Sequence, residues 1–176
     1  MAAFQRGVRD AMDGAEPALP DTVIQAALHE FSQSVMEAQR QERQALGEKN
    51  RTEGEAYLKE NGARPEVTTT ESGLQYEVLS EGDGPRPTAD QQVRVHYKGT
   101  LVDGKEFDSS YGREPVVFPV GDVIAGFSEA LQLMPVGSKY RVVIPGDLGY
   151  GTSGAGEDIG PNAMLIFEVE LLEIVP

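Results

Sequence analysis

The chain has 176 residues, 39% of them hydrophobic, and contains no cysteine; this composition supports a packed core and excludes disulfides, thiolate catalysis and thiolate metal sites. Acidic residues outnumber basic ones by 29 to 15, so nucleic acid and anionic membrane surfaces are not expected partners. Neither end carries an apolar run that is long enough to span a bilayer. We expect a cytoplasmic protein, or a periplasmic one if a signal peptide was removed.

Helical periodicity dominates the first third of the chain. Apolar residues at every fourth position predict a short helix over residues 2–12. A segment with two prolines, residues 16–20, then interrupts the pattern. Thr22 and the glutamine three residues later have the spacing of a capping box, so a second helix is expected to begin at Asp21 or Thr22 and to end near Gly62.

The apolar face of this second helix is dense only at its beginning (Val23, Ile24, Ala27, Leu28, Phe31 and Val35), and the later residues are mostly charged. Two short apolar faces from about 35 residues are too small to form an independent core. We therefore predict a homodimer through residues 1–36, because closed two-fold dimers are the commonest oligomers. The alternative is that this region folds back onto its own C-terminal domain. Gly47 and Gly54 each cost about 1 kcal/mol relative to alanine in a helix, which weakens the prediction of a straight rod.

Beyond Gly62 the periodicity changes to short alternating runs. They predict antiparallel strands at 74–78, 93–97, 116–120, 139–144 and 164–174, and Asp103-Gly104 predicts a hairpin between 100–102 and 105–107. Only 122–133 has helical spacing in this part. One helix on a twisted antiparallel sheet is an α+β fold. We expect a helical dimerisation arm over 1–62 and an α+β domain over 63–176.

Four segments of the second part stand out: Val93-Arg94-Val95-His96-Tyr97-Lys98-Gly99, Phe107-Asp108-Ser109-Ser110, Val123-Ile124-Ala125-Gly126-Phe127 and Gly149-Tyr150-Gly151. Together, over about residues 72–175, they resemble the FK506-binding-protein family of peptidyl-prolyl cis-trans isomerases. The helical region before them is similar to the arm of the bacterial macrophage-infectivity-potentiator-like and FklB-like subgroup, whose members dimerise through this segment. The resemblance implies an isomerase with unfolded or partly folded proline-containing polypeptides as substrates, chaperone activity, and macrolides such as FK506 or rapamycin as ligands.

The resemblance also assigns site residues. It implies that the catalytic pocket is formed by Tyr97, Phe107, Asp108, Phe127, Tyr150 and Phe167, and that substrate is bound by Val123, Ile124, Ile159, Arg113 and Phe118. By the same resemblance, Tyr150 donates its hydroxyl to a bound carbonyl, Phe127 supports the prolyl ring, and Arg113 braces Asp108.

Three residues depart from the family pattern. Phe127 stands where the family usually has Trp, Val116 where an aromatic residue is common, and Gly160 where the first of two prolines is usual. The smaller ring at Phe127 lacks an indole N–H, which weakens the expectation of efficient turnover and of tight macrolide binding. An alternative is therefore a proline-binding chaperone or interaction module with little turnover.

The chemistry of the residues agrees with an isomerase. Rotation about an X–Pro bond breaks amide resonance against a barrier of about 18–20 kcal/mol, and it needs no nucleophile and no cofactor. An apolar cavity that removes water from the bond would favour the twisted transition state, and Asp108 is suited to hold the Tyr97 hydroxyl. From the pattern alone, the aromatic residues also read as ordinary core and Asp108 as a turn residue. His96 and His29 are assigned no role.

A glycine-rich run, Gly149 to Gly154, matches the dinucleotide pattern G-x-G-x-x-G. That pattern requires a helix directly after it, whereas glycine, proline and then a strand follow here. A hydrolase triad of Ser153 with His96 lacks a nucleophile elbow. We expect a long loop over 145–162 that borders the pocket, and no metal site, because neither histidine clusters nor calcium-loop spacing is present.

Overall fold

The computed structural model describes residues 21–175, and the chain divides into two compact units, residues 1–42 and 43–176. The helix predicted over residues 2–12 lies outside the described residues. The predicted second helix is confirmed as α2 (Asp21–Asn61), and its first half belongs to one unit and its second half to the other. Within the described residues, none of the helices combines the length and the apolar character needed to cross a membrane.

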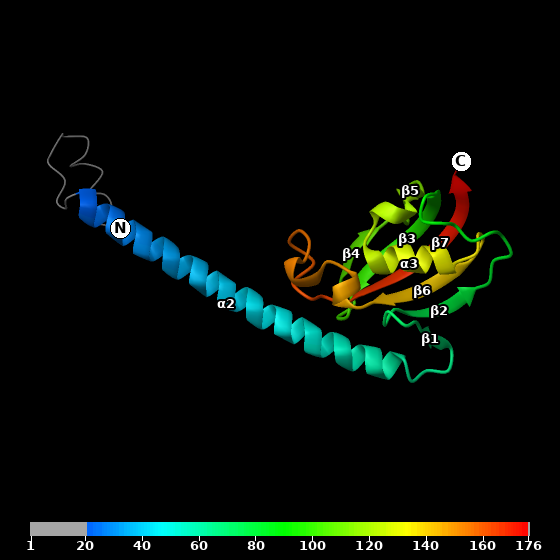
Figure 1. Cartoon of the computed structure of the whole chain (residues 1–176), viewed down its shortest axis with the longest axis horizontal. Coiled ribbons are helices and arrows are strands. Elements are labelled where there is room, and N and C mark those ends of the chain that lie inside the picture. The colour runs from blue at the N-terminus through cyan, green and yellow to red at the C-terminus, as the bar shows by residue number, and fades with distance from the viewer. Residues whose placement is uncertain (1–20, 176) are drawn as a thin grey trace. The chain divides into compact units, whose positions relative to one another are not determined.

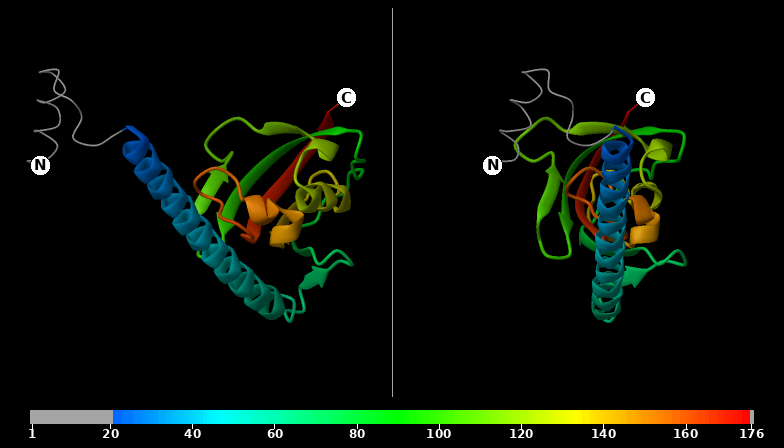
Figure 2. Two further views of the ribbon diagram at one scale, coloured as in Figure 1. Left: turned by 60° about the vertical axis from the view of Figure 1, so that its left-hand side comes forward. Right: turned by 90° about the vertical axis from the view of Figure 1, so that its left-hand side faces the viewer.

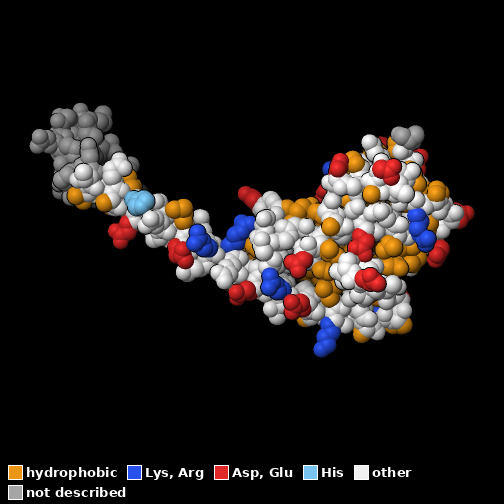
Figure 3. Space-filling model, in the orientation of Figure 1, with side chains coloured by type: hydrophobic (Ala, Val, Ile, Leu, Met, Phe, Trp, Pro, Cys, Tyr) orange, Lys and Arg blue, Asp and Glu red, His pale blue; other side chains and the backbone are white. Residues whose placement is uncertain are grey.

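The first unit is described over the first half of α2. Every side chain from Thr22 to Glu42 is exposed. The exposed residues include six large apolar ones, Val23, Ile24, Leu28, Phe31, Val35 and Met36. Figure 3 shows hydrophobic patches, in orange, along this part of the helix. Because Ile24, Leu28, Phe31 and Val35 are spaced four, three and four residues apart, they form one continuous stripe along the helix.

The second unit is built on a seven-stranded antiparallel sheet, drawn in Figure 1. Its strands are β1 (Val67–Thr69), β2 (Gln75–Ser80), β3 (Gln92–Leu101), β4 (Glu106–Ser109), β5 (Val116–Pro119), β6 (Lys139–Ile144) and β7 (Leu165–Val175). They are ordered β1-β2-β6-β7-β3-β4, and β5 also pairs with β3. The predicted hairpin at Asp103-Gly104 joins β3 to β4, and Gly104 has φ +85°, a value that favours glycine. The α+β fold is thus confirmed.

One helix, α3 (Ala125–Leu133), lies against one face of this sheet (Figures 1 and 2). Its buried residues Gly126, Phe127, Ala130 and Leu131 have helical spacing. Gly126 lies against Ile144 and Leu148, and the other three share the main core with the inward residues of the sheet, among them Val93, Val95 and Tyr97 of β3. The helix begins three residues later than predicted, because Val120–Asp122 form a short 3₁₀ turn and Val123 and Ile124 are extended. This extended pair faces the candidate site described below.

The second half of α2 packs against the sheet domain through a narrow stripe of small and polar residues. Gly47, Gly54 and Asn61 are buried there, and Asn50 and Leu58 are half-buried. With Tyr57, Leu58 packs on a small apolar cluster of Val143, Met164 and Ile166. The boundary between the two compact units consequently lies after Glu42, whereas the change in sequence pattern predicted a domain boundary at 62/63. The functional division into an arm of 1–62 and an isomerase domain of 63–176 stays a prediction.

Candidate active site

A cavity of about 380 Å³ opens between β3, β4, β5, the start of α3 and the loop that follows β6. Its wall is mainly aromatic and apolar. The lining residues are Tyr97, Phe107, Asp108, Phe118, Pro119, Asp122, Val123, Ile124, Phe127, Tyr150 and Phe167. A cavity of this size matches the volume of common small-ligand sites.

The sheet register brings the aromatic residues to one place. Gly99 on β3 pairs with Asp108 on β4 and with Phe167 on β7. A Cβ atom on Gly99 would lie 2.5 Å from the Phe107 ring and 2.9 Å from the Phe167 ring. Only glycine at this position therefore leaves room for both rings, which meet nearly edge to face with centroids 5.6 Å apart.

Phe127 forms the floor of the cavity. Its ring centroid lies 5.0 Å from that of Phe167, 6.0 Å from Phe118 and 6.3 Å from Tyr97. Only 4% of Phe127 is exposed. Tilted and edge-to-face contacts of this kind hold aromatic rings in fixed orientations, so the floor is a rigid apolar surface.

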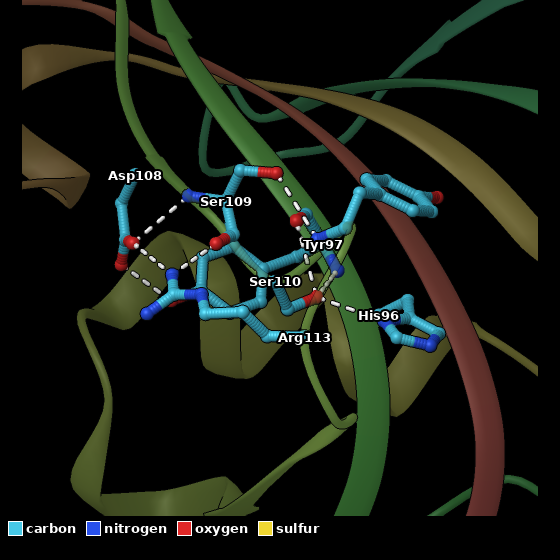
Figure 4. Close-up of polar contacts among 7 residues, drawn as sticks. His96, Tyr97, Asp108, Ser109, Ser110 and Arg113 are labelled. Carbon is cyan, nitrogen blue, oxygen red and sulfur yellow. Dashed lines mark hydrogen bonds and ion pairs between the residues drawn. The ribbon is translucent and has the colours of Figure 1, made fainter.

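The polar side of the cavity is organised by Asp108, as Figure 4 shows. The Tyr97 hydroxyl donates a hydrogen bond to Asp108 Oδ2. Asp108 Oδ1 accepts a bond from the Ser109 backbone N–H at 2.8 Å and lies 3.3 Å from Arg113 Nη2. Burial, with a further contribution from the bond to Asp108, raises the pKa of Tyr97. The hydroxyl therefore stays protonated and remains a donor in neutral solution.

Next to Tyr97, Ser110, which directly follows β4, is hydrogen-bonded to β3. Ser110 is fully buried, and its Oγ accepts a bond from the Tyr97 backbone N–H at 2.8 Å and lies 3.0 Å from His96 Nδ1 (Figure 4). The His96 ring stacks on Tyr111 with centroids 5.3 Å apart. His96 is therefore held by structural contacts and does not line the cavity.

Comparison with known proteins gives the family. A model described as FKBP-type peptidyl-prolyl cis-trans isomerase matches residues 84–172, and one described as the domain amino terminal to this isomerase matches residues 1–78. The FKBP-type 22 kDa peptidyl-prolyl cis-trans isomerase of Escherichia coli is 48% identical over 98% of this chain and 82% of its own length. The chain belongs to the FKBP-type peptidyl-prolyl cis-trans isomerases. It is an isomerase that catalyses cis-trans rotation of prolyl bonds.

Other members of the family share both parts of this FKBP-type isomerase. The outer membrane protein MIP of Legionella longbeachae is 39% identical over 96% of the chain and 73% of its own length. The crystal structure of FkpA from Escherichia coli is 37% identical, covers 99% of this chain and 82% of its own, and superposes with a TM-score of 0.84.

Most residues that the sequence suggested for the isomerase site converge on the one cavity. Arg113 does not line it and reaches it only through Asp108. Ile159 is not among the residues that line it, although it is 8% exposed and belongs to the same core cluster as the lining residues Tyr97 and Phe127. Its role as a lip residue that binds substrate stays a prediction.

Two lining residues, Pro119 and Asp122, were absent from the sequence-based set. Pro119 is the last residue of β5 and Asp122 ends the 3₁₀ turn that follows it; their closeness in sequence to Phe118 and Val123 was the only available signal. In the glycine-rich run, Gly151–Ser153 form a short 3₁₀ turn, which is not the α-helix that a dinucleotide site requires. Among the residues that the structure describes, no group of three or more His, Asp or Glu side chains is placed to hold a metal ion.

Proposed function

We propose that the aromatic cavity is the site at which this isomerase rotates the X–Pro bond. The observation that supports this most strongly is the convergence of Tyr97, Asp108, Phe127 and Tyr150 on one cavity, although these residues come from four separate segments of the chain. The site contains rigid apolar walls and one organised polar side. Such a surface suits a prolyl ring and its adjoining peptide bond.

The reaction needs solvation and shape but no covalent chemistry. The planar amide is more charge-separated than the twisted one, so that removing water from the bond raises the ground state more than the transition state. A rate gain of about 10⁵ corresponds to roughly 7 kcal/mol of differential stabilisation. The edge-to-face ring cluster around Phe127 supplies the dry surface for this effect.

The apolar and the polar residues have different roles in this proposal. Phe127 lies beneath the prolyl ring, and Tyr150, which is 39% exposed at the rim, donates its hydroxyl to a substrate carbonyl. The Tyr97 hydroxyl bonded to Asp108 keeps the carboxylate in a fixed position. Arg113 braces that carboxylate from outside the cavity. Val123, Ile124 and Phe118 line the remaining wall and contact the residues next to proline.

The test is a set of variants assayed on a short proline-containing peptide. Asp108→Leu leaves the Tyr97 hydroxyl without its acceptor, and loss of one partner of a partly buried bond costs about 1–3 kcal/mol; we expect kcat/KM to fall by about 5-fold to 150-fold. Tyr150→Phe removes only one donor and is expected to cost about fivefold. Tyr111→Phe is the control, because Tyr111 is an exposed tyrosine that stacks on His96 outside the cavity.

Unchanged kinetics for both Asp108→Leu and Tyr150→Phe, with folded variants, would show that the cavity is not the site. FK506 or rapamycin provides a second test, since either macrolide should compete with peptide for this cavity. Weak competition would agree with the smaller floor ring at Phe127.

We further propose that the isomerase is a homodimer through residues 1–36 and acts on unfolded or partly folded polypeptides. The apolar stripe of α2 that is exposed in the first unit supports this assembly. Two sites in one dimer would raise the effective concentration of the second contact with a long client chain, which would also give holdase activity.

The cytoplasmic location stays a prediction. The periplasmic alternative gains support from the relative in Legionella longbeachae, which is named an outer membrane protein. Fractionation of cells that express the chain from its natural gene decides between the two compartments.

A further inference from the structure

The loop between β6 and β7 connects the proposed site to α2. It leaves β6 at Ile144, carries Tyr150 at the rim of the cavity, and enters β7 at Leu165. Its later residues lie against the second half of α2, as the left view of Figure 2 shows. Both segments belong to the same compact unit. The rim tyrosine is therefore on a loop that a helix outside the cavity contacts directly.

Three side-chain bonds attach this loop to the helix. Asn50 Nδ2 donates to the Pro161 carbonyl at 2.8 Å, and Asn162 Nδ2 donates to the Gly47 carbonyl at 3.2 Å. The Arg43 guanidinium donates to the Ser153 carbonyl. These partners are more than a hundred positions apart in the sequence.

Asn162 also connects the helix to the rim of the cavity, through a backbone bond next to Tyr150. Its own backbone N–H donates to the Gly151 carbonyl at 2.7 Å, and Gly151 directly follows Tyr150. Asn162 is the one non-glycine residue with positive φ in the described part of the chain, at 53°, a conformation that asparagine adopts more readily than most residues. Its buried Oδ1 has no hydrogen-bond partner there, so the amide is oriented by its bond to Gly47.

The approach of helix and loop is close. A Cβ atom on Gly47 would lie 3.2 Å from Pro161 Cβ, and one on Gly160 would lie 3.0 Å from Asn50 Nδ2. A side chain at either position would therefore crowd the opposite segment and force it to shift by a few tenths of an ångström. Gly47 lowers the intrinsic stability of the helix, and this contact accounts for its presence there.

We propose that Asn50 and Asn162 are positioning residues of the isomerase: through them α2 fixes the loop that places Tyr150 at the rim of the cavity. The inference rests on the proposed role of Tyr150 as a donor to substrate. Neither asparagine touches the substrate. Their effect on the reaction is through the position of the Tyr150 hydroxyl.

The experiment is a double-mutant cycle in the full chain. Asn50→Ala removes the bond to Pro161, and we expect kcat/KM on a short proline peptide to fall about fivefold, the equivalent of one ordinary hydrogen bond. Combined with Tyr150→Phe, the same substitution should cost less than about twofold, because the hydroxyl that it positions is already absent. Gln44→Ala is the matched control, since Gln44 is an exposed amide on the same helix that bonds only to Glu48.

A second pair of measurements separates positioning from loss of fold. Asn162→Gly keeps the positive φ but deletes the bond to Gly47, and it should reproduce both the loss of activity and its dependence on Tyr150. Amide hydrogen exchange should become faster at residues 151–162 in both variants, while the thermal unfolding midpoint changes little.

The outcomes are distinct. If Tyr150→Phe alone leaves activity unchanged, the proposed role of Tyr150 fails, and this inference fails with it. If Tyr150→Phe lowers activity and the Asn50→Ala and Asn162→Gly losses simply add to it, the proposed site stands and the positioning role is overturned. No loss of activity in Asn50→Ala or Asn162→Gly also overturns it.

Discussion

The two halves of α2 form one continuous helix, but their side chains differ in burial. From Thr22 to Glu42 every side chain is exposed, including Leu28 and Phe31. From Arg43 onwards the helix buries Gly47 and Gly54 against the sheet domain. The first half carries the stripe of large apolar residues and leaves it exposed. The second half docks mainly through small and polar residues, with Tyr57 and Leu58 as its apolar contacts.

This contrast shows that helix continuity does not define a domain. The hydrophobic effect acts where apolar area leaves water, and a helix with large exposed apolar residues needs a further surface. A helix that docks by close approach needs small residues instead, since a side chain at Gly54 would crowd Met164, whose Cβ lies 3.3 Å from the Cβ position. Truncation and surface substitution test the two halves separately.

The largest effect is expected from the choice of truncation point. Removal of residues 1–42 cuts at the boundary between the compact units, and we expect the unfolding free energy of the catalytic unit to change by less than about 1 kcal/mol. Removal of residues 1–61 also takes Tyr57 and Leu58 away from Val143, Met164 and Ile166. It should cost about 3 kcal/mol or more, because that cluster becomes exposed.

Urea unfolding of the two truncated chains measures the difference directly. Turnover of short peptides by the chain that lacks residues 1–42 serves as the control for an intact cavity. Equal stability of the two truncated chains would show that the second half of α2 contributes nothing to the catalytic unit, and the boundary would return to 62/63.

A smaller effect is expected from charges on the exposed stripe of the first half. Leu28→Glu with Phe31→Glu places two carboxylates on the proposed dimer surface, and we expect the dimer dissociation constant to rise at least about 100-fold. Ala26→Glu with Gln33→Glu is the matched control on the opposite face of the helix. Sedimentation equilibrium measures both.

Turnover of short peptides should be unchanged in the charged variant, while refolding of a long client chain should slow. A variant that sediments like the wild type would remove residues 24–35 from the dimer surface. A wild-type chain that is monomeric at micromolar concentration would reject the homodimer itself.

Periodicity predicted α3 and most of the strands because each has a buried face, whereas β1 (Val67–Thr69), which has no buried residue, was not predicted. The alternation of Val93, Val95 and Tyr97 and the helical spacing of Phe127, Ala130 and Leu131 both report burial. The small and polar residues by which the second half of α2 docks gave no such signal, since glycine and asparagine produce no apolar periodicity. Its partners, such as Pro161 for Asn50, are also too distant in sequence for a local pattern to predict.

The candidate site was less accessible than the fold to reasoning from residues alone. Phe127 and Tyr97 are 4% and 8% exposed, so that their burial pattern equals that of ordinary core residues. Only resemblance to a family singled them out. Ile159 is equally buried, at 8% exposed, and belongs to the same core cluster, so that its lip position, which the resemblance also implies, stays a prediction.

The smallest effect concerns the ion pairs of two arginines, one just after the docked half of α2 and one in its exposed half. Arg64, just after α2, bonds to Glu66 and Glu77 at 2.6 and 3.0 Å and to Asn61 Oδ1 at 3.2 Å. Arg40, in the exposed half, lies 3.8 Å from Glu37. The bond to Arg64 lowers the pKa of Glu66 from its ordinary value of 4.5.

A carboxyl group whose pKa is lower in the folded state stabilises the protein above its unfolded pKa, and that contribution is lost as the pH falls through the folded value. The urea concentration at half unfolding of the full chain should therefore decrease as the pH is lowered below about 4.5, partly because of Glu66. We call this part of the pH profile the acid limb. Arg64→Met should make this acid limb shallower, since Glu66 then titrates at its ordinary value. Arg40→Met should leave the limb unchanged, because exposed ion pairs contribute little. Identical acid limbs in wild type and Arg64→Met would show that the pair at the end of the docked half is no more important to stability than the exposed one.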